Sequence, residues 1–401
     1  MIQINKKQDC CGCEACAQKC PKQCIQMKFD EQGFRYPVVD LSLCISCGLC
    51  ESVCPVIHQS GPRKPLIIYG AINRNEKIRL DSSSGGIFTA LAEKVIDKNG
   101  EVWGAMFNKN HEIVHNYVTE TEQLSLLRGS KYVQSFIGFS YKRIESSLKE
   151  GKNVLFSGTP CQVAGLKRYL KKDYSTLFTV DFVCHGVPSV GVWKKYVEQQ
   201  FGKNACLENI KFRDKTYGWG KYCFSLKQYF PKEKNFVEYR EGRYKNLYMR
   251  AFLYDLILRP SCYNCPARSF KSGSDITLAD LWGVWTTLPD YNDGKGCSCV
   301  AINTEKGKQV FECLSDSVEA KEISYKSAFV DYNYAATTNP SINSKTNVFF
   351  SQYESIPLKV LIPQLTKDSL SRKMAEGLRE ILERVGLLQV LRVLRGRLYK
   401  H

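Results

Sequence analysis

The feature that most constrains this chain is a cysteine pattern that occurs twice between Cys10 and Pro55. Each copy spaces its four cysteines by three, three and four residues and ends in a proline. Three thiolates at this spacing can hold three corners of one iron–sulfur cubane, while the fourth cysteine reaches the other cluster. The pattern therefore predicts two 4Fe–4S clusters. The predicted ligand sets are Cys10, Cys13, Cys16 and Cys54 for the first cluster, and Cys20, Cys44, Cys47 and Cys50 for the second.

Two other roles for these cysteines are less compatible with the pattern. Structural zinc sites use Cys-x2-Cys pairs separated by a finger, and they need no third cysteine three residues further on. Disulfides suit small secreted domains, whereas only a short polar stretch, and no signal peptide, precedes Cys10. Between the two runs, Asp30-Glu31-Gln32-Gly33 separates the strand-like segments 25–29 and 34–39 and predicts a β-hairpin. We expect such a two-cluster module to conduct electrons.

The composition limits the class of protein. A chain of 401 residues can bury a large core and is long enough for about two or three domains. No stretch of about 18 uninterrupted apolar residues occurs, so no membrane span is expected. The 19 cysteines, without a secretory signal, favour a reducing cytoplasm where thiols serve metal and redox chemistry.

The formal net charge of +17 raises the question of an anionic partner. Clusters with their thiolates, and any flavin, are negative, so the loaded protein is less basic than this count. We interpret the charge as electrostatic steering toward an acidic redox partner such as a ferredoxin, although a merely solvated basic surface fits nearly as well. Nucleic-acid binding is not expected, because no recognised module or aromatic-interleaved basic patch accompanies the charge.

A second domain is predicted beyond the proline-bearing linker 61–65. The segment Ser82-Ser83-Ser84-Gly85-Gly86 can cap an amphipathic helix at 87–98, and amides exposed at the helix start attract phosphate. A capped helix without a ligand would look the same. The apolar runs predict strands at 66–72, 101–107, 112–118, 153–156 and 177–183, antiparallel strands near 210–213, 222–229 and 236–239, and a helix at 245–258.

Two cysteines follow consecutive strands of this predicted α/β unit. Cys161 comes after strand 153–156, and Cys184 comes at the end of strand 177–183. The carboxyl ends of parallel strands open a crevice in which cofactors usually bind. We therefore expect these two cysteines to lie within reach of one site.

Several motifs occur in a fixed order and together carry a resemblance. They are the double cysteine run, Ser84-Gly85-Gly86, Arg128-Gly129-Ser130-Lys131-Tyr132, Gly158-Thr159-Pro160-Cys161-Gln162, Cys184-His185-Gly186 with Pro188-Ser189, Cys262-x2-Cys265-Pro266, and Ser274-Asp275-Ile276-Thr277 with Asp280 and Trp282-Gly283. This series, which runs from about Cys10 to about Asn303, resembles the coenzyme F-420 hydrogenase/dehydrogenase beta-subunit family. The resemblance implies an oxidoreductase that binds FAD and iron–sulfur clusters. It also implies electron passage between a one-electron carrier and a two-electron acceptor, while the deazaflavin is implied less directly because relatives use other substrates.

The resemblance also assigns residues to the cofactors. It implies that flavin binds at Ser83, Ser84, Gly85, Gly86, Lys131, Tyr132, Thr159 and Gln162. It brings four further cysteines around one site, where we predict a third 4Fe–4S cluster. These cysteines are Cys161, Cys184, Cys262 and Cys265.

Alternatives for this site stay open at this point. Cys161 could be a reactive thiol, or the four cysteines could simply be buried as small hydrophobes. His185 could orient or protonate a substrate as a catalytic residue, or it could be a satisfied loop histidine. The remaining cysteines have no ligand spacing, and we expect them to serve packing. They are Cys11, Cys24, Cys206, Cys223, Cys297, Cys299 and Cys313.

The expected fold is α+β, with three parts along the chain. Residues 1–62 are predicted to form a two-cluster ferredoxin domain, residues 63–345 a mixed α/β flavin-binding domain, and residues 346–401 a basic helical tail. The expected function is a cytoplasmic iron–sulfur flavoprotein oxidoreductase. It would pass electrons between a ferredoxin, or another electron-carrier protein, and a small-molecule redox substrate. The alternative is a non-catalytic electron-transfer subunit of a larger hydrogenase or dehydrogenase.

The predicted tail has a pattern of its own. Leucines and other apolar residues recur at helical spacing between Leu370 and Leu398, with arginines among them. Such a basic amphipathic helix could make a peripheral membrane contact or dock a partner. It could equally pack back on its own domain.

Overall fold

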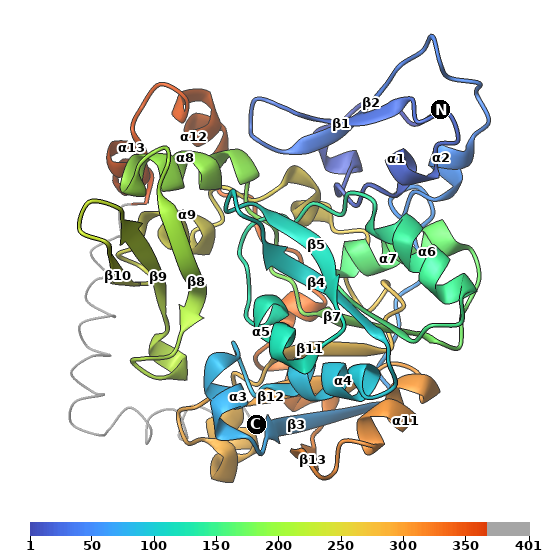
Figure 1. The fold of residues 1–401 in the computed structure, drawn as a ribbon, viewed down its shortest axis with the longest axis vertical. Helices are drawn as coiled ribbons and strands as arrows, with labels where there is room; N and C mark the ends of the chain where they lie inside the picture. Colours follow the sequence, from blue (N-terminus) through green and yellow to red (C-terminus); the bar gives the residue numbers. More distant parts are fainter. Residues whose placement is uncertain (367–401) are drawn as a thin grey trace.

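The structure, a computed structural model, describes residues 1–366 of the chain (Figure 1). An amino-terminal unit with a small hairpin packs beside a mixed eight-stranded sheet, and a separate three-stranded sheet stands at the other side (Figure 1). The basic amphipathic segment 370–398 lies outside the described residues. Within residues 1–366, the helices are too short or too polar to cross a membrane.

The amino-terminal unit contains two short helices, each of which includes one of its cysteines. The predicted hairpin is confirmed. Asp30 Oδ1 accepts hydrogen bonds from the amides of Gln32 and Phe34, which closes the turn. Gly33 has a φ of +73°, a conformation that favours glycine. The elements are η1 (Lys7–Asp9), α1 (Ala15–Lys19), β1 (Ile25–Phe29), β2 (Arg35–Val39) and α2 (Leu49–Ser52).

The large sheet has the strand order β13-β3-β12-β11-β7-β6-β4-β5. Its central pairs β4 with β6, β6 with β7, and β7 with β11 are parallel, whereas the outer pairs are antiparallel. The predicted mixed α/β sheet is therefore confirmed. The strands are β3 (Ile67–Asn73), β4 (Glu101–Phe107), β5 (Ile113–Val118), β6 (Val154–Ser157), β7 (Leu177–Phe182), β11 (Ile276–Asp280), β12 (Ser298–Ile302) and β13 (Val318–Glu322).

The predicted helix 87–98 is found as α4, which begins at Ile87 as expected but ends at Ile96 and has a different cap. The serines before α4 do not cap it; the N-cap is Gly86, with a φ of +85°. Ser84 is engaged elsewhere, because its hydroxyl donates to the carbonyl of Cys297. The helices are α3 (Glu76–Asp81), α4 (Ile87–Ile96), η2 (Thr121–Gln123), α5 (Leu124–Leu127), α6 (Ser140–Lys149), α7 (Pro160–Leu170), α8 (Val190–Phe201), α10 (Val284–Thr287), η5 (Pro289–Tyr291), α11 (Glu305–Glu312), η6 (Lys326–Val330) and η7 (Tyr334–Ala336).

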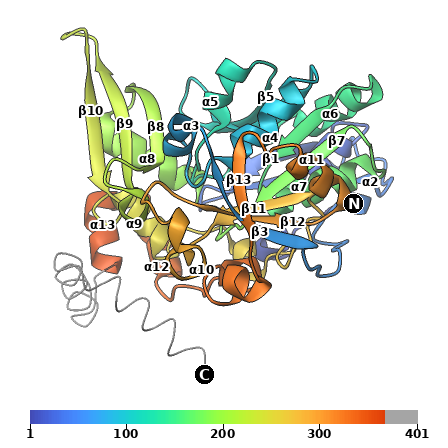
Figure 2. The ribbon, with the colours of Figure 1, turned by 90° about the horizontal axis from the view of Figure 1, so that it is seen from below.

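The predicted antiparallel segments form the three-stranded sheet β10-β9-β8. Figure 2 shows this sheet at one side of the molecule, with α9 and α13 near its base. The predicted helix 245–258 is shorter in the structure, because α9 ends before Asp255, which has a φ of +55°. The elements are β8 (Cys206–Asp214), η3 (Trp219–Lys221), β9 (Cys223–Phe230), β10 (Asn235–Gly242), α9 (Leu247–Leu253) and η4 (Pro260–Asn264).

An aromatic core joins the three-stranded sheet to the helices around it. Trp193 of α8, Phe212 of β8 and Tyr248 of α9 are fully buried in this core. Helices α12 (Thr346–Gln352) and α13 (Leu358–Leu365) pack on the same core through Phe349, Leu361 and other apolar side chains. The start of the predicted tail is therefore part of the folded body.

Candidate iron–sulfur and flavin sites

The four cysteines predicted to hold the second cluster line one pocket. Cys20, Cys44, Cys47 and Cys50 surround an empty volume of about 350 Å³, with Ile45 at the rim. Cys47 is exposed, so this pocket lies at the surface of the amino-terminal unit. Soft thiolates around a pocket of this kind fit an iron–sulfur cluster.

A fifth cysteine, Cys24, lines the same pocket. Its sulfur lies 3.3 Å from the sulfur of Cys20. Cys24 is buried, as expected of a packing residue. The cysteine spacing favours Cys20 as the ligand, while the structure brings both sulfurs to the pocket.

The first predicted ligand set is also brought together. Burial, followed by the nearby Cys10 and Cys54, raises the pKa of the Cys16 thiol. Burial likewise raises the pKa of Cys54, with Cys10 contributing. Iron binds the thiolate, and a buried group of thiols becomes anionic readily only when a cation compensates it. The donor set therefore fits a cationic iron–sulfur centre.

The cysteines predicted for a third cluster converge in the large domain. Cys161 begins α7, Cys184 follows β7, and Cys262 lies in η4. Burial, then the neighbouring thiols Cys262, Cys161 and Cys265, raises the pKa of Cys184. The amide of Val187 donates to the Cys262 sulfur at 3.3 Å. The expected meeting of Cys161 and Cys184 at adjacent strand ends is thus found, and η4 adds the other pair.

A pocket adjoins this four-cysteine site. It is lined by Cys184, Cys265 and Pro160 among others, and its empty volume is about 340 Å³. Among residues 1–366, no group of three or more His, Cys, Asp or Glu side chains is placed to hold a single metal ion. A cubane differs from such a site, because each thiolate binds a different iron. The four cysteines fit a cluster, because thiolates are suitable iron ligands and because the four residues converge on one site.

The predicted flavin residues of the β3–α4 region meet a second predicted loop. The amide of Ser130 donates to Ser83 Oγ at 2.7 Å, so the segments 83–86 and 128–132 are joined. The Gly85 amide donates to Ser298 Oγ at 2.9 Å. A Cβ at Gly85 would lie 2.4 Å from the carbonyl oxygen of Ala71. Gly85 therefore permits a close contact within the protein, whereas the sequence suggested close approach by a ligand.

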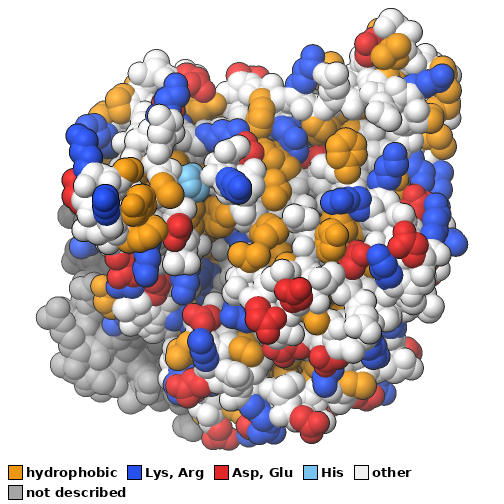
Figure 3. Space-filling model, viewed as in Figure 1, with side chains coloured by type: hydrophobic (Ala, Val, Ile, Leu, Met, Phe, Trp, Pro, Cys, Tyr) orange, Lys and Arg blue, Asp and Glu red, His pale blue; other side chains and the backbone are white. Residues whose placement is uncertain are grey.

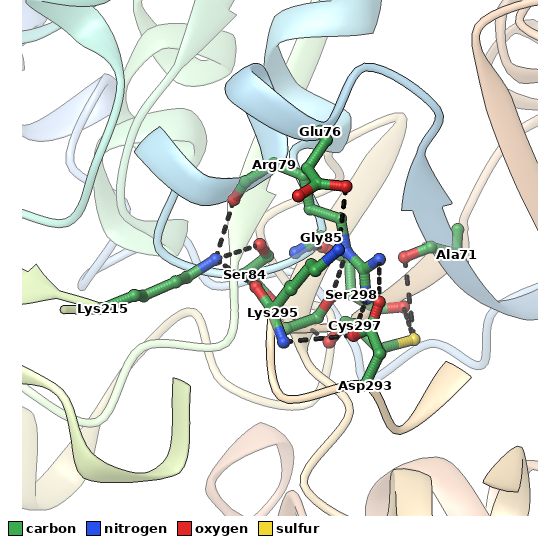
Figure 4. A network of polar contacts seen from close by, with 11 residues as sticks. Ala71, Glu76, Arg79, Ser84, Gly85, Lys215, Asp293, Lys295, Cys297 and Ser298 are labelled. Carbon is green, nitrogen blue, oxygen red and sulfur yellow. Dashed lines mark hydrogen bonds and ion pairs between the residues drawn. The ribbon is translucent and has the colours of Figure 1, made fainter. Parts of the chain in front are cut away.

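Lys215 holds the same segment from the other side. Its ammonium group donates to the carbonyls of Arg79, Ser84 and Lys295 at 2.7 to 2.8 Å. Arg79 in turn pairs with Asp293 at 2.7 Å. Figure 4 shows the Lys215 side chain reaching the backbone of Arg79 and Ser84, with Asp293 at the Arg79 guanidinium. The network fixes the position of the predicted flavin segment.

Lys131 and Tyr132 lie on the joined loop. The Lys131 ammonium group donates to the carbonyls of residues 126, 127, 128 and 129 at 3.0 to 3.2 Å. Burial lowers the pKa of Lys131 to about 7. The Tyr132 ring packs on Phe252 with a centroid distance of 4.6 Å. Lys131 therefore orders the loop backbone, while Tyr132 is anchored by its ring.

Thr159 and Gln162 form a capping box at the start of α7. Gln162 Nε2 also donates to Ser135 Oγ at 2.9 Å, which ties α7 to the chain just beyond Tyr132. The hydroxyl of Thr159 lies 3.2 Å from the Cys161 sulfur. The predicted flavin residues thus border the four-cysteine site.

His185 has a partner that the sequence did not indicate. Its Nε2 makes a short hydrogen bond to Asp255 Oδ1. The imidazole is 43% exposed. The arrangement resembles a satisfied loop histidine, and the catalytic role of His185 stays a prediction.

Two buried arginines near these sites have no counterpart among the predicted site residues. Arg259 is fully buried and donates to the carbonyls of Cys10 and Arg35 and to Gln134 Oε1. Arg213 pairs with Asp280 at the end of β11. In the sequence, the motif that contains Asp280 was the only indication of a role for Arg213. No local sequence pattern indicated a role for Arg259.

The expectation of packing holds for five of the other seven cysteines. Cys11, Cys24, Cys223, Cys297 and Cys299 are buried. It is wrong for Cys206, at the edge-exposed start of β8, and for Cys313, at the exposed end of α11.

Two protein-family models match this chain. Residues 9–57 match a 4Fe–4S dicluster domain, which contains both predicted N-terminal ligand sets. Residues 151–326 match the model that describes the carboxy terminus of the beta subunit of coenzyme F420 hydrogenase/dehydrogenase. The second match covers all four cysteines of the large-domain site.

The relatives of known name agree with these models. The chain is 24% identical over 322 residues to the coenzyme F420-dependent sulfite reductase of Methanocaldococcus jannaschii, covering 78% of this chain and 46% of that protein. It thus spans less than half the length of this relative. It is 25% identical over 336 residues to one of the subunits of the F(420)H(2) dehydrogenase of Methanosarcina mazei, covering 78% of this chain and 84% of that protein.

A solved structure of the F420-reducing NiFe hydrogenase complex from Methanosarcina barkeri also aligns. The identity is 18%, the coverage is 69% of this chain and 88% of that chain, and the TM-score is 0.45.

Proposed function

Since this chain belongs to the coenzyme F420 hydrogenase/dehydrogenase beta-subunit family and carries a 4Fe–4S dicluster domain, we propose that it is an iron–sulfur flavoprotein oxidoreductase that uses FAD. Electrons would pass between a ferredoxin-type carrier and a two-electron acceptor. FAD would supply the exchange between single electrons and electron pairs. The acceptor would be a small molecule.

The order of the cysteine sites carries this proposal. The pocket of the second cluster is at the surface, where Cys47 is exposed. Cys13 of the first set is buried and lies against α7, where a Cβ at Gly165 would be 3.1 Å from its sulfur. The four-cysteine site then adjoins Thr159, a predicted flavin residue. Such an order suits electron transfer from an external carrier to a buried acceptor.

We assign the flavin to the joined segments 83–86 and 128–132 and to the start of α7. The hydrogen bond from Ser130 to Ser83 and the one from Gln162 to Ser135 support a single wall formed by these segments. The chain's own contribution would be to fix this wall and to exclude water around the reacting ring. The division into domains at residues 1–62 and 63–345 belongs to this proposal, as does a cytoplasmic location.

The direct test is the cofactor content of protein purified without oxygen. We expect the visible spectrum to show iron–sulfur clusters and flavin together, and acid extraction to release FAD. Three clusters predict about twelve irons per chain, whereas about eight would remove the third cluster. Colourless protein, or protein with zinc in place of iron, would overturn the proposal.

A second candidate is a non-catalytic electron-transfer subunit. It is favoured by one relative, which is named as part of a dehydrogenase and 84% of whose length this chain covers. The two candidates differ when the protein is assayed alone. Flavin that is reduced by ferredoxin and reoxidised by a small molecule without any partner supports the first, and flavin that is reoxidised only with a partner supports the second.

A further inference from the structure

We propose that Arg259 and Cys11 form the junction through which the first cluster communicates with the four-cysteine site. Arg259 is a positioning residue whose fixed positive charge raises the reduction potential of the first cluster. Cys11 is a thiol that binds no iron and fills the gap between the two sites. The inference rests on the proposed function, because it concerns the cysteine sites that the function uses.

Cys11 connects cysteines from both parts of the chain. Cys11 is buried in one apolar cluster with Cys13, of the first ligand set, and Cys161, of the large-domain set, packs against that cluster. Cys11 is only 4% exposed, and its carbonyl accepts a hydrogen bond from Gln134 Nε2 at 3.1 Å. Cys13, Cys11 and Cys161 therefore lie in one packed group that joins the two parts of the chain. Its role goes beyond packing.

Helix α7 approaches the first ligand set closely. Cys161 and Gly165 are one turn apart on α7 and so share a face. A Cβ at Gly165 would lie only 3.1 Å from the Cys13 sulfur. The missing side chain at Gly165 lets α7 bring Cys161 near the amino-terminal unit. The two sulfur sites are thus joined by direct packing.

Arg259 holds the loop that carries the first ligands. Its Nε donates to the Cys10 carbonyl at 2.8 Å, and its Nη2 donates to the Arg35 carbonyl at 2.9 Å. Gly12, with a φ of +69°, allows this approach, since a Cβ there would lie 3.0 Å from the guanidinium carbon of Arg259. The guanidinium group is therefore built into the cluster loop.

Among residues 1–366, no carboxylate accepts a hydrogen bond from Arg259. Its three acceptors are two carbonyls and the side-chain amide of Gln134, all of them neutral. The neighbouring groups that can become anionic include Cys10, Cys11 and Cys262. A fully buried guanidinium is costly unless an anion compensates it. Iron-bound thiolates on both sides would supply that compensation.

A fixed positive charge beside a cluster favours its reduced form, because reduction adds one negative charge. A ferredoxin-type carrier would supply one electron to a cluster held by the amino-terminal cysteines. A cluster held by Cys161, Cys184, Cys262 and Cys265 would take up that electron. No bond forms or breaks, and no proton is required.

The test compares Arg259→Met with Arg259→Lys in the full chain purified without oxygen. The potentials of the clusters are measured by redox titration with detection by electron paramagnetic resonance. Arg259→Met should disfavour reduction of one amino-terminal cluster about tenfold, which is about 59 mV for one electron. Arg259→Lys, which keeps the charge, should restore most of the shift. Arg250→Met is the control and should leave all potentials unchanged.

Cys11→Ala tests the thiol. Iron and sulfide content should equal those of the parent chain, whereas the rate of electron arrival at the four-cysteine site should fall severalfold. Loss of about four irons would make Cys11 a ligand and overturn its assignment. An unchanged rate would also overturn it.

The outcomes separate this inference from the proposed function. Unshifted potentials in Arg259→Met overturn the role of Arg259 even if all clusters and flavin are present. Protein without iron instead overturns the proposed function. If Arg259→Met does not fold, Arg259→Gln is the second neutral variant, and if neither folds, the rate measured for Cys11→Ala decides.

Discussion

The backbone of Gly33, at the tip of the amino-terminal hairpin, lies directly against the backbone of Gly191 in α8. The Gly191 amide donates to the Gly33 carbonyl at 3.2 Å, and a Cβ at Gly33 would lie 2.5 Å from the Gly191 Cα. The hydroxyl of Ser189 also donates to the carbonyl of Gln32 at 2.6 Å. The hairpin thus docks on the large domain where two glycines, Gly33 and Gly191, meet backbone to backbone.

Gly33→Ala should weaken this docking. The added methyl meets the α8 backbone, and the φ of +73° strains any residue with a Cβ. We expect a loss of about 2 to 4 kcal/mol in the free energy of unfolding, measured by denaturant titration. Gly151→Ala is the matched control, because Gly151 has a φ of +78° but nothing within 4 Å of the added Cβ. Equal losses in both variants would contradict the docking role.

Cys20→Ser and Cys24→Ser should differ, although their sulfurs lie 3.3 Å apart. The spacing assigns Cys20 as a ligand of the second cluster, so its loss should remove about four irons per chain. Cys24→Ser should retain them. Iron analysis of protein purified without oxygen makes the measurement, and the reverse result would exchange the two assignments.

Cys184→Ser should remove about four irons if the large-domain cysteines hold a third cluster, while the two amino-terminal clusters persist. Cys299→Ser provides the control, because Cys299 is fully buried on β12 and lies outside the four-cysteine site. Iron content that is equal in both variants and in the parent chain would leave the four cysteines as packing residues.

Lys131→Met should reduce flavin retention severalfold. The ammonium group organises four successive carbonyls of the 126–129 turn, so its loss should loosen the loop that carries Tyr132. The ratio of FAD to protein after gel filtration is the measurement. Lys149→Met, on the exposed end of α6, should keep the parent ratio.

Stability should depend on pH through His115. Burial is the main reason that the pKa of His115 is lowered to about 4 from 6.5. The charge of Lys131 also lowers this pKa, whereas the hydrogen bond to the Ser157 carbonyl raises it. The unfolded chain therefore binds this proton more readily between about pH 4 and 6.5, and the free energy of unfolding falls as the pH falls through that window. His115→Gln should remove this contribution, which is up to about 3 kcal/mol at pH 4. Parallel pH profiles for the parent and the variant would contradict the assignment.

Local sequence patterns predicted the structural elements whose contacts join residues close together in the chain. The Asp30–Gly33 turn and the parallel pair β6 and β7 arise within a few residues or between consecutive elements. The boundaries were less certain where a single residue leaves the helical region, as Asp255 does after α9. The role of the serines before α4 was misjudged, because distant residues such as Cys297 bind them.

The basic side chains do not gather in one patch on the face drawn in Figure 3. Basic and acidic side chains are interspersed there with hydrophobic ones (Figure 3). Steering toward an acidic carrier, which the net charge suggested, therefore stays a prediction about the whole molecule.

The sequence alone predicted the amino-terminal ligand sets, because a cubane requires cysteines at short and fixed intervals along the chain. Only the tertiary structure decided that Arg259 binds the Cys10 carbonyl across 249 residues, that His185 pairs with Asp255, and that Cys11 and Cys161 pack in one cluster. Such contacts form where separate elements pack, and packing leaves no spacing rule in the chain. The predicted ligand positions thus follow from local sequence spacing, whereas the contacts between the sites depend on the tertiary fold.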